Sequence, residues 1–170
     1  MRTSRRSLSN GIDDRRTRST KDAEGQAGAL VVMIDDVERI EQLHGPAGLA
    51  EVVRVAGQRI RQTLRADDFT AHWGAEELVV VLRDVSLDSA VEVGQRIRIT
   101  ISQPIALHDG RSVVPACSIG AAGGDPDRVD VLIDRARLAL ELAKDSGGNC
   151  VRRALAPEDR WTAGAAVAGL

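Results

Sequence analysis

Two acidic pairs are the residues of this 170-residue chain whose spacing points most directly to chemistry. Asp35-Asp36 follows the apolar run Ala29 to Ile34, and Glu76-Glu77 lies between two short stretches that are typical of a hairpin. If the hairpin tip faces the end of the first strand, these carboxylates could hold a hard divalent cation such as Mg²⁺ for phosphoryl or nucleotidyl transfer. The alternative interpretation is that the acids are simply solvated, as Asp and Glu at turns usually are.

The segments that would position these acids alternate between strand and helix patterns. Continuous apolar runs indicate strands, apolar residues spaced three and four apart indicate helices, and Ser86 is typical of a helix N-cap. In chain order, the expected elements are a strand over 29–34, helices over 37–44 and 47–65, a hairpin over 69–73 and 77–82, a helix over 86–103, strands over 105–108 and 112–121, a helix from about 132 to 147, and a strand over 150–153. This order, β-α-α-β-β-α-β-β-α-β, predicts an α/β sandwich with a mixed sheet.

Composition and charge narrow the classes of function. The chain has one Phe, two Trp and no Tyr, so base-stacking platforms for single-stranded nucleic acid are not expected. Residues 1–21 hold seven basic and two acidic side chains, and the rest of the chain is acidic, which argues against nucleic-acid binding by the body. The pattern predicts a disordered Arg/Ser-rich arm over 1–27, a folded domain over 28–153 and a C-terminal tail over 154–170.

The two cysteines, Cys117 and Cys150, lie in separate apolar stretches and form neither a disulfide framework nor a metal-ligand cluster. No apolar run is long enough to span a bilayer, and no apolar stretch follows the N-terminal Arg residues as in a signal peptide. We therefore expect a reduced, cytoplasmic protein without a membrane span.

Several strings, in their order and spacing, resemble the GGDEF domain, the catalytic module of diguanylate cyclases, over residues 28–153. The family signature Gly-Gly-(Asp/Glu)-Glu-Phe corresponds to Gly74-Ala75-Glu76-Glu77-Leu78. Further similar strings are Ile34-Asp35, Cys117-Ser118-Ile119-Gly120 and the stretch Leu138 to Asn149. The resemblance implies a nucleotidyl-cyclase-like sandwich, with a central mixed, mostly antiparallel sheet flanked by helices. It also implies the condensation of two GTP molecules to cyclic di-GMP with Mg²⁺.

Several positions depart from the family pattern. The resemblance assigns Mg²⁺ to the positions of Met33 and Glu76, and a thioether cannot replace a carboxylate for a hard cation. Asp35 could substitute in part, because it lies on the same face of the strand as Met33. The positions that read guanine in the family are Glu41 and Ala50, and Ala50 has no hydrogen-bonding side chain. The Mg²⁺ site implied by the resemblance is therefore incomplete.

Two other ligand positions of the family have counterparts in this chain. Lys144 matches a phosphate-binding Lys, although the Arg that follows it in the family is Gly148 here. Arg65-Ala66-Asp67-Asp68 matches the Arg-x-x-Asp of an inhibitory site for cyclic di-GMP, lying five residues before Gly74. Arg and a carboxylate suit guanine, and Arg98 or Arg96 could complete the site. The alternative interpretation is that Arg65 and Asp68 form only a local ion pair at a helix end.

These observations leave three functions open. The first is a degenerate GGDEF domain that is catalytically inactive and serves as a regulatory or binding module in cyclic di-GMP signalling. The second is an active diguanylate cyclase that uses Glu76 and Glu77, with Asp35 and Glu76 as metal ligands. The third is a protein-interaction domain that binds no nucleotide. The expected partners are cyclic di-GMP or GTP, a protein partner or a second copy of the chain, and not nucleic acid.

Overall fold

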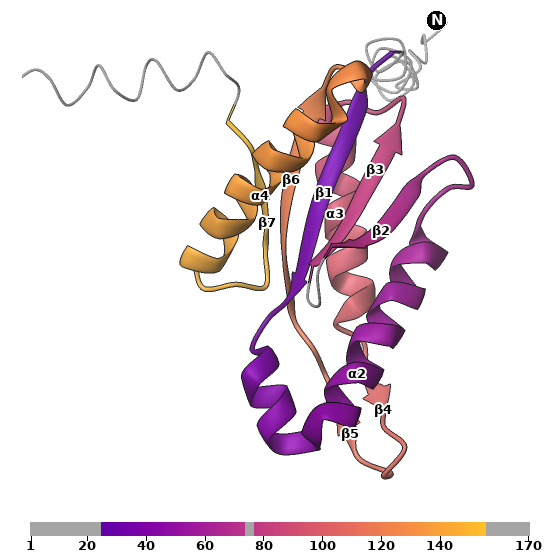
Figure 1. The fold of residues 1–170 in the computed structure, drawn as a ribbon, viewed down its shortest axis with the longest axis vertical. Helices are drawn as coiled ribbons and strands as arrows, with labels where there is room; N and C mark the ends of the chain where they lie inside the picture. The colour runs from indigo at the N-terminus through magenta and orange to yellow at the C-terminus, as the bar shows by residue number, and fades with distance from the viewer. Residues whose placement is uncertain (1–24, 74–76, 156–170) are drawn as a thin grey trace, which may run out of the picture.

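A five-stranded sheet forms the centre of the structure, a computed structural model that describes residues 25–73 and 77–155. Its strands, in spatial order, are β2 (Phe69–Trp73), β3 (Glu77–Arg83), β1 (Ala27–Ile34), β6 (Cys117–Gly124) and β7 (Val151–Arg153). All neighbouring strands are antiparallel except β6 and β7, which are parallel. A separate two-stranded ribbon consists of β4 (Ile105–Ala106) and β5 (Ser112–Val113). The expected mixed, mostly antiparallel sheet is confirmed (Figure 1).

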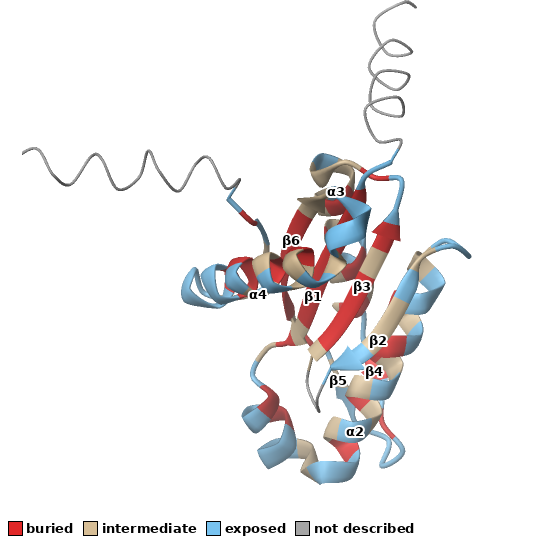
Figure 2. Cartoon of the chain, turned by 45° about the horizontal axis from the view of Figure 1, so that its top comes forward, coloured by how far each residue is buried: buried red, intermediate tan, exposed pale blue. Residues whose placement is uncertain are grey.

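Within residues 25–73 and 77–155, three helices divide between the two faces of this sheet. The helices are α2 (Val37–Thr63), α3 (Leu87–Ile101) and α4 (Val129–Asp145), and a short 3-10 turn, Pro126–Arg128, precedes α4. Leu30, Val32 and Ile34 of β1 pack with α2 and α3, whereas Ala29 and Val31 face α4. The alternation of β1 side chains therefore places β1 between two apolar layers, and Figure 2 shows that the central strands are buried.

The boundaries of some elements differ from the expectations. The two helices expected over 37–44 and 47–65 are confirmed as the two parts of α2, which meet at a kink at Gly45, whose φ of 73° and ψ of 173° are not helical. The strand expected over 112–121 is divided into β5 and β6, because Pro115 lacks the N–H that a continuous ladder needs. The N-cap at Ser86 is confirmed, since its hydroxyl accepts a hydrogen bond of 3.2 Å from the Ser89 N–H.

The helix α4 approaches β6 closely because the residues between them are small. A Cβ added to Gly120 would lie 1.8 Å from the Ala136 carbonyl oxygen, so only glycine fits at this point of the strand. Ala136, Ala139 and Ala143 of α4 are fully buried against the sheet. This contact holds α4, and with it the residues at its C-terminal end, in a defined position over β1 and β6.

The described elements run from Ala27 to Arg153. The expected arm and tail fall largely on residues 1–24 and 156–170, which lie outside the described residues. Of the helices described in residues 25–73 and 77–155, none combines the length and the apolar character needed to cross a membrane.

Candidate functional site

Asp35, the first residue after β1, has both carboxylate oxygens engaged in hydrogen bonds. Its Oδ1 accepts a bond of 2.7 Å from the Ser118 hydroxyl of β6, and its Oδ2 accepts one of 2.7 Å from the Asn149 backbone N–H. The Asp35 N–H donates to the Ala116 carbonyl oxygen at 2.9 Å. Asp35 therefore fastens the end of β1 to β6 and to the loop that precedes β7.

The loop that Asp35 holds depends on backbone conformations that favour glycine. Gly147 and Gly148 have φ values of 101° and 74°, and a Cβ on Gly148 would lie 3.0 Å from the Asp35 Oδ2. A side chain at position 148 would therefore strain the backbone and crowd the carboxylate. Gly148, which stands where the resemblance implies an Arg, therefore suits this loop.

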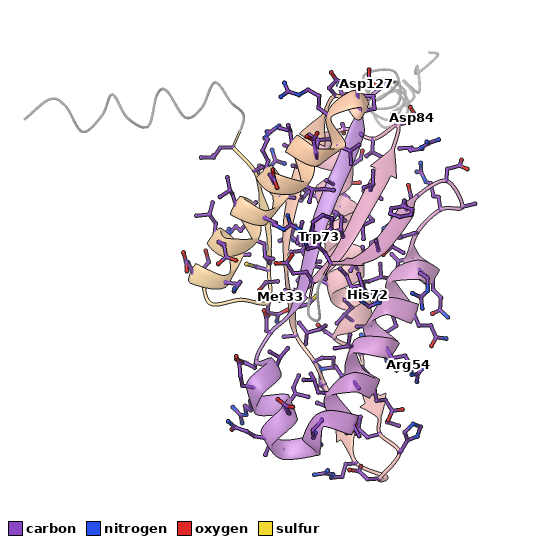
Figure 3. The ribbon with its side chains drawn as sticks, in the orientation of Figure 1. Met33, Arg54, His72, Trp73, Asp84 and Asp127 are labelled. Carbon is purple, nitrogen blue, oxygen red and sulfur yellow. The ribbon has the colours of Figure 1, made fainter. Side chains whose placement is uncertain are left out.

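Met33 and Glu77 are cross-strand neighbours in the ladder between β1 and β3. The Glu77 carboxylate pairs with Arg137 of α4, whose Nε lies 3.2 Å from the Glu77 Oε2. The guanidinium of Arg137 also lies over the ring of Trp73, 4.7 Å from its centroid. Figure 3 labels Met33 and Trp73 at this end of the sheet. Glu77 is therefore partly buried in an ion pair and is not directed at Asp35, which is held by Ser118 and Asn149.

The described side chains do not fit a Mg²⁺ ion. Mg²⁺ demands several oxygen ligands in a near-octahedral arrangement. The described residues contain no group of three or more His, Cys, Asp or Glu that could hold a metal. Met33 contributes a sulfur, and the carboxylates of Asp35 and Glu77 are occupied by Ser118, Asn149 and Arg137. The expected ligand Glu76 lies, with Gly74 and Ala75, outside the described residues.

A cavity of about 460 Å³ opens between α2 and β2, and its walls are mostly aliphatic. Val37, Leu49, Ala50 and Val53 line it, together with Pro46 and the two polar side chains Arg54 and His72, which Figure 3 labels. Ala50, one of the expected guanine-reading positions, belongs to this wall, whereas Glu41 does not. The sequence reasoning did not find Arg54, because one charged residue on a helix of many charged residues gives no signal.

The expected phosphate ligand Lys144 lies in the last turn of α4 and is exposed. Its Nζ lies 3.4 and 3.5 Å from the two carboxylate oxygens of Glu141, one helical turn earlier. A pair spaced three residues apart on an exposed helix surface is weak, so the ammonium group can exchange this partner for another anion.

The Arg-x-x-Asp string forms the turn between α2 and β2. The Asp68 Oδ2 accepts a hydrogen bond of 2.8 Å from the Arg65 backbone N–H, and Oδ1 accepts one of 3.4 Å from the Arg83 N–H. The Arg65 side chain is exposed. Asp68 therefore shapes the turn and ties it to the end of β3.

Arg98 was expected to join Arg65 and Asp68, but its hydrogen bonds go elsewhere. Its Nε donates to the Gln95 side-chain oxygen and one of its terminal nitrogens donates to the Asn149 side-chain oxygen, both at 3.0 Å. Within the described residues, no hydrogen bond links Arg98 to Arg65 or Asp68. Arg98 instead extends the network of Asp35, Ser118 and Asn149.

Cys117, next to Ser118 on β6, belongs to the same surroundings. Burial raises the pKa of its thiol to about 12, and the nearby negative charge of Asp35 acts in the same direction. A thiol that stays protonated at neutral pH is a poor nucleophile. Cys117 is therefore a packing residue of this region and not a reactive one.

Comparisons with known proteins point to a single family. The chain matches the family model for the diguanylate cyclase GGDEF domain over residues 3–150. It is 32% identical over 127 residues to the response regulator PleD of Caulobacter vibrioides, covering 72% of this chain and 28% of PleD. It is 35% identical over 130 residues to the uncharacterized protein YhcK of Bacillus subtilis, covering 72% of this chain and 35% of YhcK. The chain thus spans about a third of these relatives.

Among solved structures, the isolated GGDEF domain of PA1120 from Pseudomonas aeruginosa superposes with a TM-score of 0.74. It shares 27% of its sequence with this chain, and the superposition covers 89% of this chain and 92% of that structure. The family model, the relatives and the fold agree, and they confirm the resemblance drawn from Gly74 to Leu78 and its neighbouring strings: the chain belongs to the GGDEF domain family of diguanylate cyclases.

Proposed function

We propose that this GGDEF domain makes no cyclic di-GMP and acts as a regulatory or binding module in cyclic di-GMP signalling. The observation that carries the proposal is that the carboxylates of Asp35 and Glu77 are already engaged by other residues of the chain. The carboxylate of Asp35 is used by Ser118 and Asn149, and that of Glu77 by Arg137, while Met33 stands where a hard cation would need an oxygen. A metal ion would have to break these contacts before it could bind the same oxygens.

The cavity beside β2 supports the same proposal. Reading guanine requires hydrogen-bond donors and acceptors placed against the edge of the base. Val37, Leu49, Ala50 and Val53 place hydrocarbon at the corresponding wall. A buried base edge without partners loses its hydrogen bonds to water without replacement, which costs about 1–3 kcal/mol for each group. GTP would therefore bind weakly even if its phosphates contacted Lys144.

The direct test is an assay of the purified chain with GTP and either Mg²⁺ or Mn²⁺, in which cyclic di-GMP is measured by chromatography with mass detection. We expect no product above the protein-free blank, whereas an active diguanylate cyclase in the same buffer supplies the positive control. Product that depends on the chain and disappears in the Glu76→Ala variant would establish an active cyclase and overturn the proposal.

We also propose that the ligand of this module is cyclic di-GMP, bound at Arg65. The exposed Arg65 side chain supports this, because an Arg can donate two hydrogen bonds to the O6 and N7 atoms of guanine. Asp68 already accepts two backbone hydrogen bonds, so it supports the turn and offers only its remaining lone pairs to a ligand. Arg98 is not part of the proposed site.

Titration calorimetry with cyclic di-GMP tests the site. We expect the Arg65→Ala variant to bind at least tenfold more weakly than the natural chain, and the Arg128→Ala variant, at another exposed arginine, to bind equally well. If the natural chain shows no binding heat, the ligand assignment fails while the proposal of an inactive domain still stands. The remaining function would then be the nucleotide-independent protein-interaction domain.

A further inference from the structure

The two edges of the central sheet differ in how they are protected against pairing with another chain. At one edge, β7 is three residues long and carries the exposed cations Arg152 and Arg153. At the other edge, β2 is five residues long, and its sequence Phe-Thr-Ala-His-Trp contains no Asp, Glu, Lys or Arg. Short length and charged side chains are the usual means of keeping an edge strand from pairing. The edge at β7 has both, and the edge at β2 has neither.

The side chains of β2 add an apolar surface to this uncharged edge. Phe69 and Trp73 are 63% and 57% exposed, although they are the only aromatic residues in the described part of the chain. With Ala71 between them, they line a groove of about 680 Å³. Alternate residues of a strand share a face, so all three lie on the α4 side of the sheet. Large exposed aromatic side chains beside a groove are typical of an interaction surface.

We infer that β2 pairs in antiparallel fashion with β2 of a second copy of this chain, with Ala71 on the twofold axis. The register follows from the strand itself. When Ala71 lies opposite Ala71 of the second copy, Phe69 lies opposite Trp73 of that copy, and Trp73 opposite its Phe69. Both aromatic pairs then lie on one face, where directly opposed aromatic side chains stabilise an antiparallel pair. The association joins two sheets into one and covers an edge that each copy leaves open.

The charge and the area of the surface both suit a second copy. Two identical strands that contain no Asp, Glu, Lys or Arg place none of these charges opposite its like. A Phe or Trp side chain buries about 150–250 Å² when fully covered, so the exposed parts of the four aromatics amount to roughly 400–600 Å². Small specific interfaces begin near a total of about 1,200 Å². The aromatics thus supply about a third to a half of a minimal interface. We therefore expect a dimer that dissociates on dilution.

Sedimentation analysis of the full chain over a wide range of concentration tests the association. We expect a reversible equilibrium between monomer and dimer in the natural chain, and monomer throughout for the Ala71→Lys variant, because two cations would face each other on the axis. The Ser112→Lys variant, which adds the same charge at exposed β5, should dimerise as the natural chain does. A natural chain that stays monomeric at several hundred micromolar, or an Ala71→Lys variant that dimerises unchanged, would overturn the inference.

Disulfide trapping tests the register without relying on a disruptive variant. Directly opposed residues of antiparallel strands have Cα atoms about 4.5–5.5 Å apart, within the range of a disulfide. In a chain whose Cys150 is replaced by Ser, mild oxidation should cross-link the Ala71→Cys variant efficiently. The Thr70→Cys variant should cross-link poorly, because Thr70 faces His72 of the second copy and the two new cysteines lie about 8 Å apart. Equal cross-linking of the two variants contradicts the pairing centred at Ala71.

Discussion

One face of the sheet is closed over β1 and β6 and open over β2 and β3. In the closed part, α4 lies against the strands and the contacting residues are small, with Gly120 and Ala136 at the closest approach. In the open part, Phe69 and Trp73 are exposed beside a groove. The large aromatic side chains thus lie beyond the close contact of α4, which reaches Trp73 only through the Arg137 side chain, and the smallest residues lie where the helix is closest. The comparison shows that packing here is set by how closely two backbones can approach, and not by the size of the apolar side chains.

The largest effect should come from closing the space that α4 needs. In the Gly120→Ala variant, the new methyl group would lie within 1.8 Å of a carbonyl oxygen and 2.4 Å of the Leu140 nitrogen, so α4 must move away from the sheet. We expect a loss of more than about 4 kcal/mol in the free energy of unfolding, measured in urea. The matched change Gly57→Ala meets only ordinary contacts at 3.7 Å in a helix and should stabilise the chain by roughly 0.5–1 kcal/mol. Equal effects of the two changes would contradict this account of the closed part.

The next effect separates buried from exposed leucines on the same helix. Leu140 is fully buried against the sheet, and Leu138 is 53% exposed. We expect the Leu140→Ala variant to lose about 2–5 kcal/mol in the free energy of unfolding, because it leaves a cavity in the closed part. The Leu138→Ala variant should lose less than about 1 kcal/mol. A reversed order would show that the outer face of α4 is covered in solution.

A smaller effect is expected at the strand end held by Asp35. The Asp35→Ala variant removes the acceptor of two hydrogen bonds and leaves the donors of Ser118 and Asn149 without this partner. We expect a loss of about 1–3 kcal/mol in the free energy of unfolding. The Asp36→Asn change at the exposed neighbouring residue should cost only a few tenths of a kcal/mol, because Asn also tolerates the left-handed backbone that Asp36 adopts. Urea titration of both variants should show this difference in the free energy of unfolding.

The smallest effect at neutral pH, where the thiol is protonated in both the folded and the unfolded chain, concerns Cys117. Because burial raises the pKa of this thiol to about 12, the folded chain keeps a proton that the unfolded chain releases above about pH 9. The free energy of unfolding should therefore fall between pH 9 and 12, and this slope should be shallower in the Cys117→Ala variant. At pH 8, a thiol reagent should modify Cys150, which is only partly buried, well before Cys117. Rapid modification of Cys117 in the folded chain would contradict the assignment.

The sequence predicted the elements better than their contacts. Apolar periodicity located the strands, the hairpin and the helices, because these patterns report on short-range geometry. The kink at Gly45 separates the two expected helices, and the break before β6 changed a strand boundary without changing the order of the elements. The exposure of Phe69 and Trp73 could not be predicted, because a strand pattern does not say which helix covers which part of a sheet.

The candidate site was less predictable, because its contacts join residues that are far apart in the chain. Asp35 was expected beside a metal, and its partners Ser118 and Asn149 lie 83 and 114 positions away. Arg98 was expected beside Arg65, and its hydrogen bond to Asn149 depends on the direction in which α3 crosses the sheet. No local pattern encodes such a direction. The absence of an oxygen at Met33 was, in contrast, visible in the sequence, because it follows from residue type alone.

The hydrogen bond from Asn149 to Asp35 also has a consequence for how the domain folds. It joins the beginning of the described chain to its last strand, so it closes a loop of 114 residues. Contacts between residues so distant in sequence form late and slow the search for the native topology. During synthesis, the end of β1 cannot reach its final state until Asn149 has left the ribosome, so the domain completes its folding only when almost all of its sequence has been made.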